Sequence, residues 1–124
     1  MTQSDTNYAR GIRAEGAAKS YLEEDGYEIL HERYKSKFGE IDIIAIKDRV
    51  LCFVEVKMRK TVHEALESVT AKSQKRIENT ALLFLSNNPD YTNYNMRFDV
   101  VAISYSNDDK LSITHLDNAW EARS

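Results

Sequence analysis

The segment FGEIDIIAIKDRVLCFVEVKMR, residues 38–59, places charged side chains inside two otherwise apolar runs. They are Glu40, Asp42, Glu55 and Lys57. Paired carboxylates can hold a hard divalent cation, and a lysine beside them can bind a phosphate oxygen or orient an attacking water molecule. This chemistry requires the charged side chains to converge on one face of the fold.

A β-hairpin would bring these side chains together. With Asp48 and Arg49 at its tip, antiparallel pairing sets Asp42 opposite Glu55 and places the other two charged residues beside them. Opposed side chains share a face of the sheet, with Cβ atoms ~4.5–5.5 Å apart. A loop with one residue more or fewer would shift the register and separate the two carboxylates.

The opposite face of the hairpin is expected to be wholly apolar. Its residues are Ile41, Ile43, Ala45, Cys52, Val54 and Val56. The charged face also becomes apolar nearer the turn, so we expect other parts of the chain to cover both faces. Like charges opposed on a covered sheet are unfavourable unless a cation compensates them. Mg²⁺ or Mn²⁺ fits that role better than Zn²⁺, because the chain has one cysteine and three scattered histidines.

Glu15 is a further candidate, on a predicted helix. At helical spacing it shares a stripe with Gly11, Ala18 and Leu22. A carboxylate on a buried stripe needs a partner, and a surface arginine would serve as well as a metal ion.

A structural interpretation stands beside the chemical one. Acids and lysines often alternate on half-exposed sheets, and a bare E-x-K occurs by chance in most proteins. The cations of KSQKR at 72–76 are more often a solvated helix face than a track for phosphates. In RFDVV we favour a structural pair of Arg97 and Asp99 over a catalytic one.

Two helices follow from apolar periodicity and from helix-end signals. The first runs from Thr6 to about Glu24 and ends at Gly26. The second begins at an N-cap, Thr70, and reaches about Ser86, before NNPD. Its apolar stripe comprises Ile77, Ala81 and Phe84.

Five strands complete the predicted α/β fold. They are expected at 27–34, 40–47, 50–57, 96–105 and 111–116, with the turn SNDDK before the last. A helix lies in the crossover between the third and fourth strands, and this favours parallel pairing between them. We therefore expect a mixed sheet flanked by helices, in the order αβββαββ.

Length and charge limit the number of domains, the cellular location and the kind of surface that the protein can have. A chain of 124 residues fits a single domain, 1–124, with a core at about 8–116. No apolar run approaches the ~20 residues that span a bilayer, so we expect a cytoplasmic protein without membrane contact. Cys52 is expected to be buried and reduced. The net charge of −3 argues against a uniformly basic surface, but RYKSK, KMRK and KSQKR hold more than half of the seventeen cations.

Several of these segments together resemble a known protein family. Gly11 with Glu15, GEIDII at 39–44, FVEVKMR at 53–59, KSQKR and RFDVV are similar to the YraN family of small bacterial proteins. That family resembles the archaeal Holliday junction resolvases of the PD-(D/E)XK, or restriction-endonuclease-like, nuclease superfamily. The resemblance covers about Gly11 to Val101 and implies an αβββαβ core, in agreement with the predicted elements.

The resemblance also implies roles for individual residues. Asp42 matches the first acid of the superfamily motif, Glu55 and Lys57 match its E-x-K, and Glu15 matches an acid on the first helix. Gln74 lies where some relatives carry a glutamine on the second helix. Ile41 stands where the superfamily name has proline, a change that is frequent in this branch.

We therefore expect a Mg²⁺- or Mn²⁺-dependent endonuclease acting on DNA, including structured or branched DNA. Asp42, Glu55, the Val56 carbonyl and Glu15 would hold the ion, and Lys57 would assist catalysis. The expected phosphate contacts are Arg59, Lys60, Lys72, Gln74, Lys75 and Arg76. Analogy with the resolvases leaves a homodimer open. The alternatives are a nuclease-like module that binds nucleic acid or a partner without cutting, and a phosphodiesterase acting on RNA or a small nucleotide.

Overall fold

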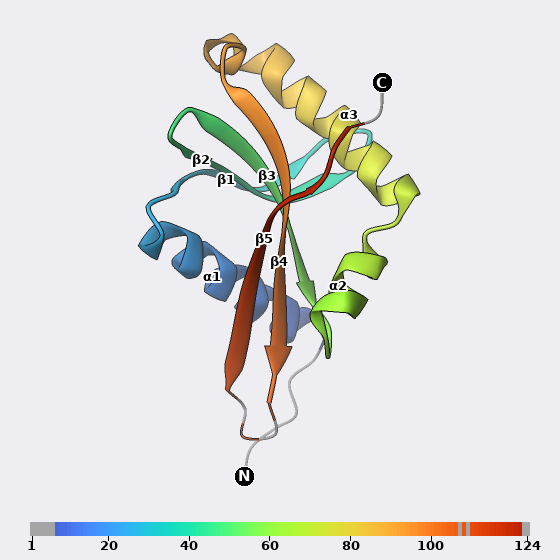
Figure 1. Ribbon diagram of the computed structural model, residues 1–124. Helices are drawn as coiled ribbons and strands as arrows, with labels where there is room; N and C mark the ends of the chain where they lie inside the picture. The colour runs from blue at the N-terminus through green and yellow to red at the C-terminus, as the bar shows by residue number, and fades with distance from the viewer. Residues whose placement is uncertain (1–6, 107, 109, 123–124) are drawn as a thin grey trace.

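The computed structural model describes residues 7–106, 108 and 110–122. The elements are α1 (Asn7–Glu24), β1 (Glu28–Lys35), β2 (Glu40–Lys47), β3 (Val50–Met58), α2 (Val62–Ser68), α3 (Ala71–Asn87), a 3-10 turn (Pro89–Tyr91), β4 (Asn95–Tyr105) and β5 (Leu111–Trp120). The strands form one sheet in the order β1-β2-β3-β4-β5, with β3 and β4 parallel and the other neighbours antiparallel. The predicted α/β fold with a mixed, helix-flanked sheet is confirmed (Figure 1).

The sheet is covered on both faces. Ala14, Ala18 and Leu22 of α1 pack on one face, against β2, β3 and β4 residues that include Cys52. The predicted stripe of α3, which begins at Ile77, packs on the other face. Figure 1 shows α1 and α3 on opposite sides of the strands. Cys52 is buried as predicted, and burial raises the pKa of its thiol to about 12.

The first helix ends where its sequence predicts. Gly26 has φ +92, a left-handed conformation that glycine adopts without strain. The Gly26 N–H donates to the Glu23 carbonyl at 3.0 Å, and the Tyr27 N–H donates to the Leu22 carbonyl at 2.9 Å. These two bonds form a Schellman C-cap, and the buried Tyr27 and Leu22 side chains belong to the same cluster. The predicted helix start at Thr6 lies outside the described residues.

The β2–β3 hairpin has the predicted tip and register. Asp48 and Arg49 have φ 52 and φ 61, as a type I′ turn requires. The ladder then follows the predicted pairing as far as Ile43 opposite Val54. It does not extend to the predicted pairing of Asp42 with Glu55; beyond Val54, the Val56 N–H of β3 donates to the Asp42 side chain.

The charged end of β2 departs from strict alternation. Ile41 was predicted on the face of Ile43, and this was wrong: it packs with Ile44 in the cluster beneath α3. Two residues three positions apart can share a face only where the alternation is interrupted between them. The β1–β2 ladder likewise omits Asp42 and the β1 residue beside it, Arg33, which has φ 51.

Glu40 also differs from its predicted position. It lies opposite Lys35 of β1, and the β2–β3 ladder ends before the expected pairing of Glu40 with Lys57. The cause is the same interruption at Asp42, since the predicted pairing assumed a regular hairpin to the end of both strands.

Two further elements differ from the sequence prediction. Helix α2 was not predicted; it is short, begins at an N-cap, Thr61, and has Ala65 as its buried residue. Strand β5 continues beyond the predicted residue 116 to Trp120, whose ring stacks on Phe98 with centroids 5.1 Å apart. Thr70 caps α3 as predicted, accepting the Ser73 N–H at 3.1 Å. Residues 107 and 109 of the predicted SNDDK turn lie outside the described part.

Candidate active site

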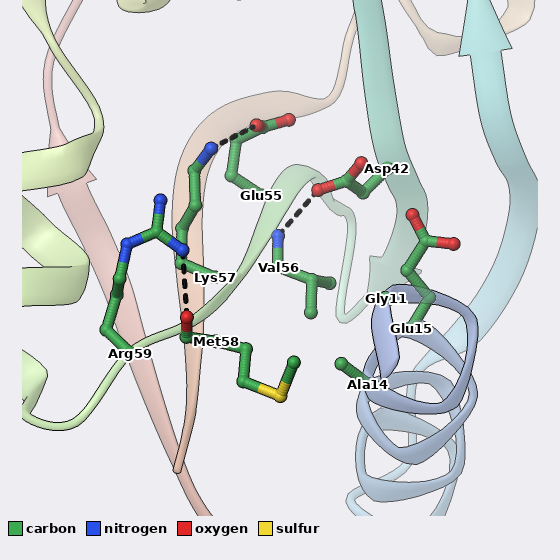
Figure 2. Close-up of a pocket in the computed structure, with 9 residues that line it drawn as sticks. All are labelled: Gly11, Ala14, Glu15, Asp42, Glu55, Val56, Lys57, Met58 and Arg59. Carbon is green, nitrogen blue, oxygen red and sulfur yellow. Dashed lines mark hydrogen bonds and ion pairs between the residues drawn. The ribbon is translucent and has the colours of Figure 1, made fainter. Parts of the chain in front are cut away.

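A cavity of about 380 Å³ opens between α1 and the carboxyl-terminal half of β3. Its lining residues come from α1, β2, β3 and the residue after β3: Gly11, Ala14, Glu15, Asp42, Glu55, Val56, Lys57, Met58 and Arg59 (Figure 2). The structure thus brings together the predicted catalytic residues Glu15, Asp42, Glu55 and Lys57.

Asp42 points into this cavity because β2 is irregular at its position. Its Oδ2 accepts a hydrogen bond from the Val56 N–H of β3 at 2.8 Å. At the end of the β2–β3 ladder, the Asp42 side chain therefore accepts a hydrogen bond from a backbone N–H of β3. Burial raises the pKa of Asp42 to about 6, against the effect of the Val56 hydrogen bond, and the charge of Glu15 adds to the rise.

Glu55 is the least compensated polar group of the cavity. Its residue is 8% exposed, and among the described residues its Oε1 is buried with no hydrogen-bond partner. Its Oε2 lies 3.9 Å from the Lys57 Nζ, too far for a hydrogen bond. Burial, followed by the charge of Asp42, raises the pKa of Glu55 to about 8. Two carboxylates thus converge with too few donors to stabilise both charges.

This donor set suits a hard cation with oxygen ligands. A divalent ion would compensate both carboxylates and give the buried Glu55 Oε1 a partner. Within the described ranges, however, no three His, Cys, Asp or Glu side chains form a group that could hold an ion. The protein ligands would therefore be Asp42, Glu55 and the Val56 backbone carbonyl, with water or a substrate phosphate completing the shell.

Glu15 forms an ion pair with an arginine, which is one of the two partners that its position in the sequence allowed. Its Oε2 lies 2.7 Å from the Arg33 Nη2 and accepts a hydrogen bond from the Arg33 Nε at 2.8 Å. Glu15 nevertheless lines the cavity, so the ion pair fixes a carboxylate at its edge. Arg33 was not predicted from the sequence, because its left-handed backbone conformation and its place beside Asp42 depend on strand pairing.

The predicted phosphate contacts lie around the cavity and along α3. Arg59 lines the cavity, and its Nη1 donates to the Met58 carbonyl at 2.8 Å. The cavity lining does not include the other predicted contacts, which are Lys60, Lys72, Gln74, Lys75 and Arg76. None of the five predicted lysine and arginine contacts forms an ion pair with a carboxylate in the described part of the chain.

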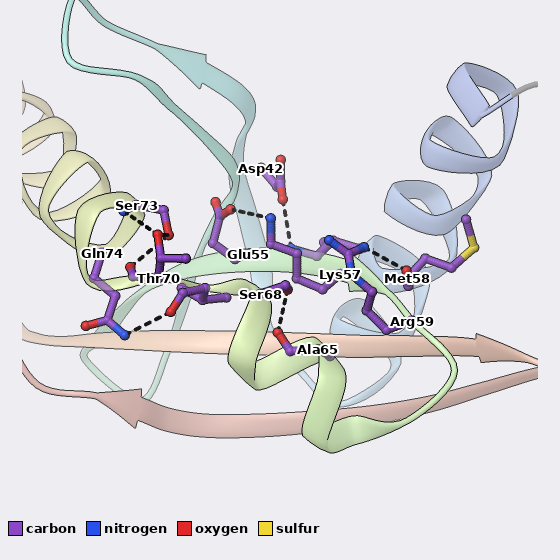
Figure 3. Close-up of polar contacts among 12 residues, drawn as sticks. Asp42, Glu55, Lys57, Met58, Arg59, Ala65, Ser68, Thr70, Ser73 and Gln74 are labelled. Atoms are coloured by element: carbon purple, nitrogen blue, oxygen red, sulfur yellow. Dashed lines mark hydrogen bonds and ion pairs between the residues drawn. The ribbon is translucent and has the colours of Figure 1, made fainter.

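Gln74 has a structural contact that sequence did not predict. Its Nε2 donates to the Val69 carbonyl at 3.2 Å, which joins the first turn of α3 to the end of α2 (Figure 3). Lys75 and Glu78 border a small hollow of about 60 Å³ beside it. This hydrogen bond ties α3, the helix that carries three of the predicted cations, to the end of α2.

The pair predicted in RFDVV is structural and belongs to a larger cluster. Arg97 donates to both oxygens of Asp99, from Nε and Nη2, at 2.9 Å each. His115 Nε2 and the Asn118 N–H complete the surroundings of this carboxylate at 2.8 and 3.0 Å, and the Arg97 Nη2 also donates to the Tyr27 hydroxyl. Sequence reasoning missed the last three partners, because distant segments supply them.

In the described part of the chain, no helix combines the length and the apolar composition that crossing a bilayer requires.

Comparison with known proteins places the chain among bacterial relatives. A sequence profile of the uncharacterised protein family UPF0102 matches residues 14–103. A UPF0102 protein of Mesorhizobium japonicum is 45% identical over 96 residues, 77% of each chain. One from a Sulfurihydrogenibium species is 45% identical over 113 residues, 90% of this chain and 93% of its own. One from a Chelativorans species is 40% identical over 116 residues, 94% and 90% of the two chains.

Proposed function

The chain belongs to the uncharacterised protein family UPF0102, and we propose that it is a metal-dependent nuclease that hydrolyses phosphodiester bonds in DNA. The observation that carries the proposal is the pair of Asp42 and Glu55. These carboxylates face one cavity, both have raised pKa values, and Glu55 Oε1 lacks a hydrogen-bond partner among the described residues. A fold that buries two facing carboxylates with too few donors to stabilise both charges is suited to bind a cation.

The residues of the cavity have distinct roles in this proposal. Asp42, Glu55 and the Val56 carbonyl hold Mg²⁺ or Mn²⁺. When bound, the ion lowers the pKa of a coordinated water molecule and neutralises charge on the phosphate. Lys57 donates to a phosphate oxygen or orients the attacking water, and Glu15, held by Arg33, assists at the edge of the metal shell.

The nucleic-acid part of the proposal rests on unpaired cations. Arg59, Lys60 and the three cations at the start of α3 form no ion pair with described carboxylates, whereas Lys19, Arg33 and Lys47 do. Cations left free in this way can bind phosphates and release counterions. Phosphate contacts of this kind position a nucleic acid without reading its sequence.

A non-catalytic module that binds nucleic acid or a partner remains the second candidate. The observation in its favour is that no three acids of the described chain form a metal cluster. Such a module would use the same cations and would be indifferent to Mg²⁺. A phosphodiesterase acting on RNA or a small nucleotide would use the same carboxylates on another substrate.

A cleavage screen tests the nuclease proposal. Plasmid, branched DNA, single-stranded DNA and RNA are incubated with the protein in Mg²⁺ and in Mn²⁺. We expect metal-dependent cleavage of DNA by the wild type, and we expect Asp42→Asn and Lys57→Ala to abolish it. Asp90→Asn, which changes an exposed acid outside the cavity, is the control and should cleave like the wild type. Cleavage of RNA alone would favour the phosphodiesterase. Metal-independent binding without cleavage of any substrate would favour the module.

A further inference from the structure

The turn between β1 and β2 exposes an aromatic ring beside the proposed active-site strand. Phe38 is 39% exposed, whereas Phe53, Phe84 and Phe98 are 0%, 1% and 4% exposed. These three rings stack or pack edge-on with other aromatic rings of the core. The close ring contact of Phe38 is with a cation, the Nζ of Lys37, 5.3 Å from the ring centroid.

Hydrogen bonds hold this turn in a defined conformation. Ser36 Oγ accepts the Phe38 N–H at 3.0 Å, and the Ser36 N–H donates to the Gly39 carbonyl at 2.8 Å. The Ser36 and Thr80 hydroxyls lie 2.9 Å apart, which ties the turn to α3. The Phe38 ring is therefore presented to solvent by an ordered support, at little entropic loss on binding.

The surroundings of Phe38 favour a polyanion over an apolar protein partner. Lys35, Lys37 and Arg76 are exposed, and none of them forms an ion pair with a carboxylate in the described residues. Arg76 lies directly beside the turn, with its Cβ 3.5 Å from the position that a Cβ on Gly39 would take. A rigid aromatic ring among free cations is the combination that binds single-stranded nucleic acid, by base stacking and phosphate contact.

The position of the turn connects it with the cavity. Phe38 precedes Asp42 by four residues, and Asp42 lies on the strand that begins just after the turn. Four extended residues span at most ~13 Å. Stacked bases are ~3.4 Å apart along one strand, so a base on Phe38 would lie within about four nucleotides of a phosphate at Asp42.

We propose that Phe38 stacks on an unpaired base of the substrate, so that the protein acts on nucleic acid with a single-stranded segment beside the scissile phosphate. This inference rests on the proposed function and specifies its substrate class. Lys37 leaves the ring when the base stacks and binds a neighbouring phosphate. A fully paired duplex or four-way junction keeps its bases in the stack, and taking one out requires unpairing it.

Binding without metal tests this inference separately from cleavage. Fluorescence anisotropy is measured in EDTA with a labelled single strand and with a blunt duplex of the same length. We expect Phe38→Ala to weaken binding of the single strand by about tenfold and to leave duplex binding nearly unchanged. Phe38→Trp should retain the affinity, and its indole emission should be quenched by the single strand. Leu82→Ala, which removes another exposed apolar side chain, is the matched control.

The outcomes separate the two proposals. Unchanged single-strand affinity in Phe38→Ala, an equal loss on single strand and duplex, or no binding by the wild type would overturn the stacking inference. Selective loss of single-strand binding supports it. If that selective loss occurs and no substrate is cut in Mg²⁺ or Mn²⁺, the stacking surface stands and the nuclease proposal fails.

Discussion

Asp99 and Glu55 are buried carboxylates on neighbouring strands of one sheet, and the chain surrounds them in opposite ways. Asp99 is 0% exposed and both of its oxygens accept hydrogen bonds, from Arg97, from His115 and from a backbone N–H. Burial acts to raise the pKa of Asp99, but these hydrogen bonds outweigh it and hold the pKa below its usual value. Glu55 is 8% exposed, has an unpartnered oxygen within the described structure and has a raised pKa.

The contrast separates two reasons to bury an acid. Asp99 connects β4 with β5 and, through Arg97, with Tyr27 before β1, so it stabilises the fold that supports the cavity. Glu55 contributes no comparable contact, and its burial destabilises the folded state at neutral pH, because the folded protein must hold a proton on Glu55 that the unfolded chain releases. A buried carboxylate that lowers stability is expected in a ligand-binding site, because active sites often contain groups that serve function at a cost in folding stability.

The largest effect is expected at the compensated site. Asp99→Ala leaves Arg97 without its carboxylate in a half-buried position, and breaking a buried pair in this way lowers the free energy of unfolding by about 3–5 kcal/mol. Urea denaturation of this variant and of Asp90→Ala measures the difference. A loss below 1 kcal/mol for Asp99→Ala would remove the distinction between the two acids.

Removing the buried carboxylate of the cavity is expected to increase the free energy of unfolding, which is the opposite of the effect expected at Asp99. The folded protein keeps a proton on Glu55 up to a pH of about 8, whereas the unfolded chain releases it near its ordinary value of 4.5. Between these values the unfolded state binds fewer protons, so the free energy of unfolding falls as the pH rises. Glu55→Gln should remove the contribution of Glu55 to this slope and be more stable than the wild type by on the order of 4 kcal/mol at pH 8, with little difference at pH 4.5.

Denaturant titrations at a series of pH values check this prediction in the absence of divalent ions. Glu28→Gln, at an exposed position on β1, serves as the control and should retain the slope of the wild type. A Glu55→Gln variant that is less stable than the wild type at pH 8 would show that Glu55 is compensated after all.

A smaller effect is expected at the edge of the Asp99 cluster. Tyr27→Phe removes the hydroxyl that accepts a hydrogen bond from the Arg97 Nη2 at 2.6 Å, while the ring can remain in place. Loss of one such bond lowers the free energy of unfolding by about 1 kcal/mol. The same denaturation assay measures it, with Tyr105→Phe as the control. If Tyr27→Phe lowered the free energy of unfolding as much as Asp99→Ala does, Tyr27 rather than Asp99 would be the main stabilising residue of the cluster.

The sequence predicts the parts of this fold that local rules determine. The turn at Asp48 and Arg49 sets the register of β2 and β3, and Thr70 marks the start of α3 through a hydroxyl that caps its own helix. Both depend on residues that are close along the chain. Helix α2 was missed because a single buried residue, Ala65, gives no apolar periodicity to detect.

The site was predictable as a set of residues but not in its geometry. Alternation in the two runs identified Asp42 and Glu55, and both line the cavity. The interruption that turns Asp42 out of the ladder involves Arg33 of the neighbouring strand, which no local pattern in β2 reveals. The surroundings of Asp99 were likewise hidden, because His115 comes from β5, sixteen positions further along.

Calorimetric titration of Mn²⁺ tests most directly whether the uncompensated pair is a metal site, because it needs no knowledge of the substrate. The wild type, Glu55→Gln and Asp90→Asn are titrated at one pH. We expect the wild type and Asp90→Asn to bind Mn²⁺ alike, and Glu55→Gln to bind it at least tenfold more weakly. Equal binding by all three proteins, or no binding by the wild type at millimolar Mn²⁺, would contradict a metal site at Asp42 and Glu55.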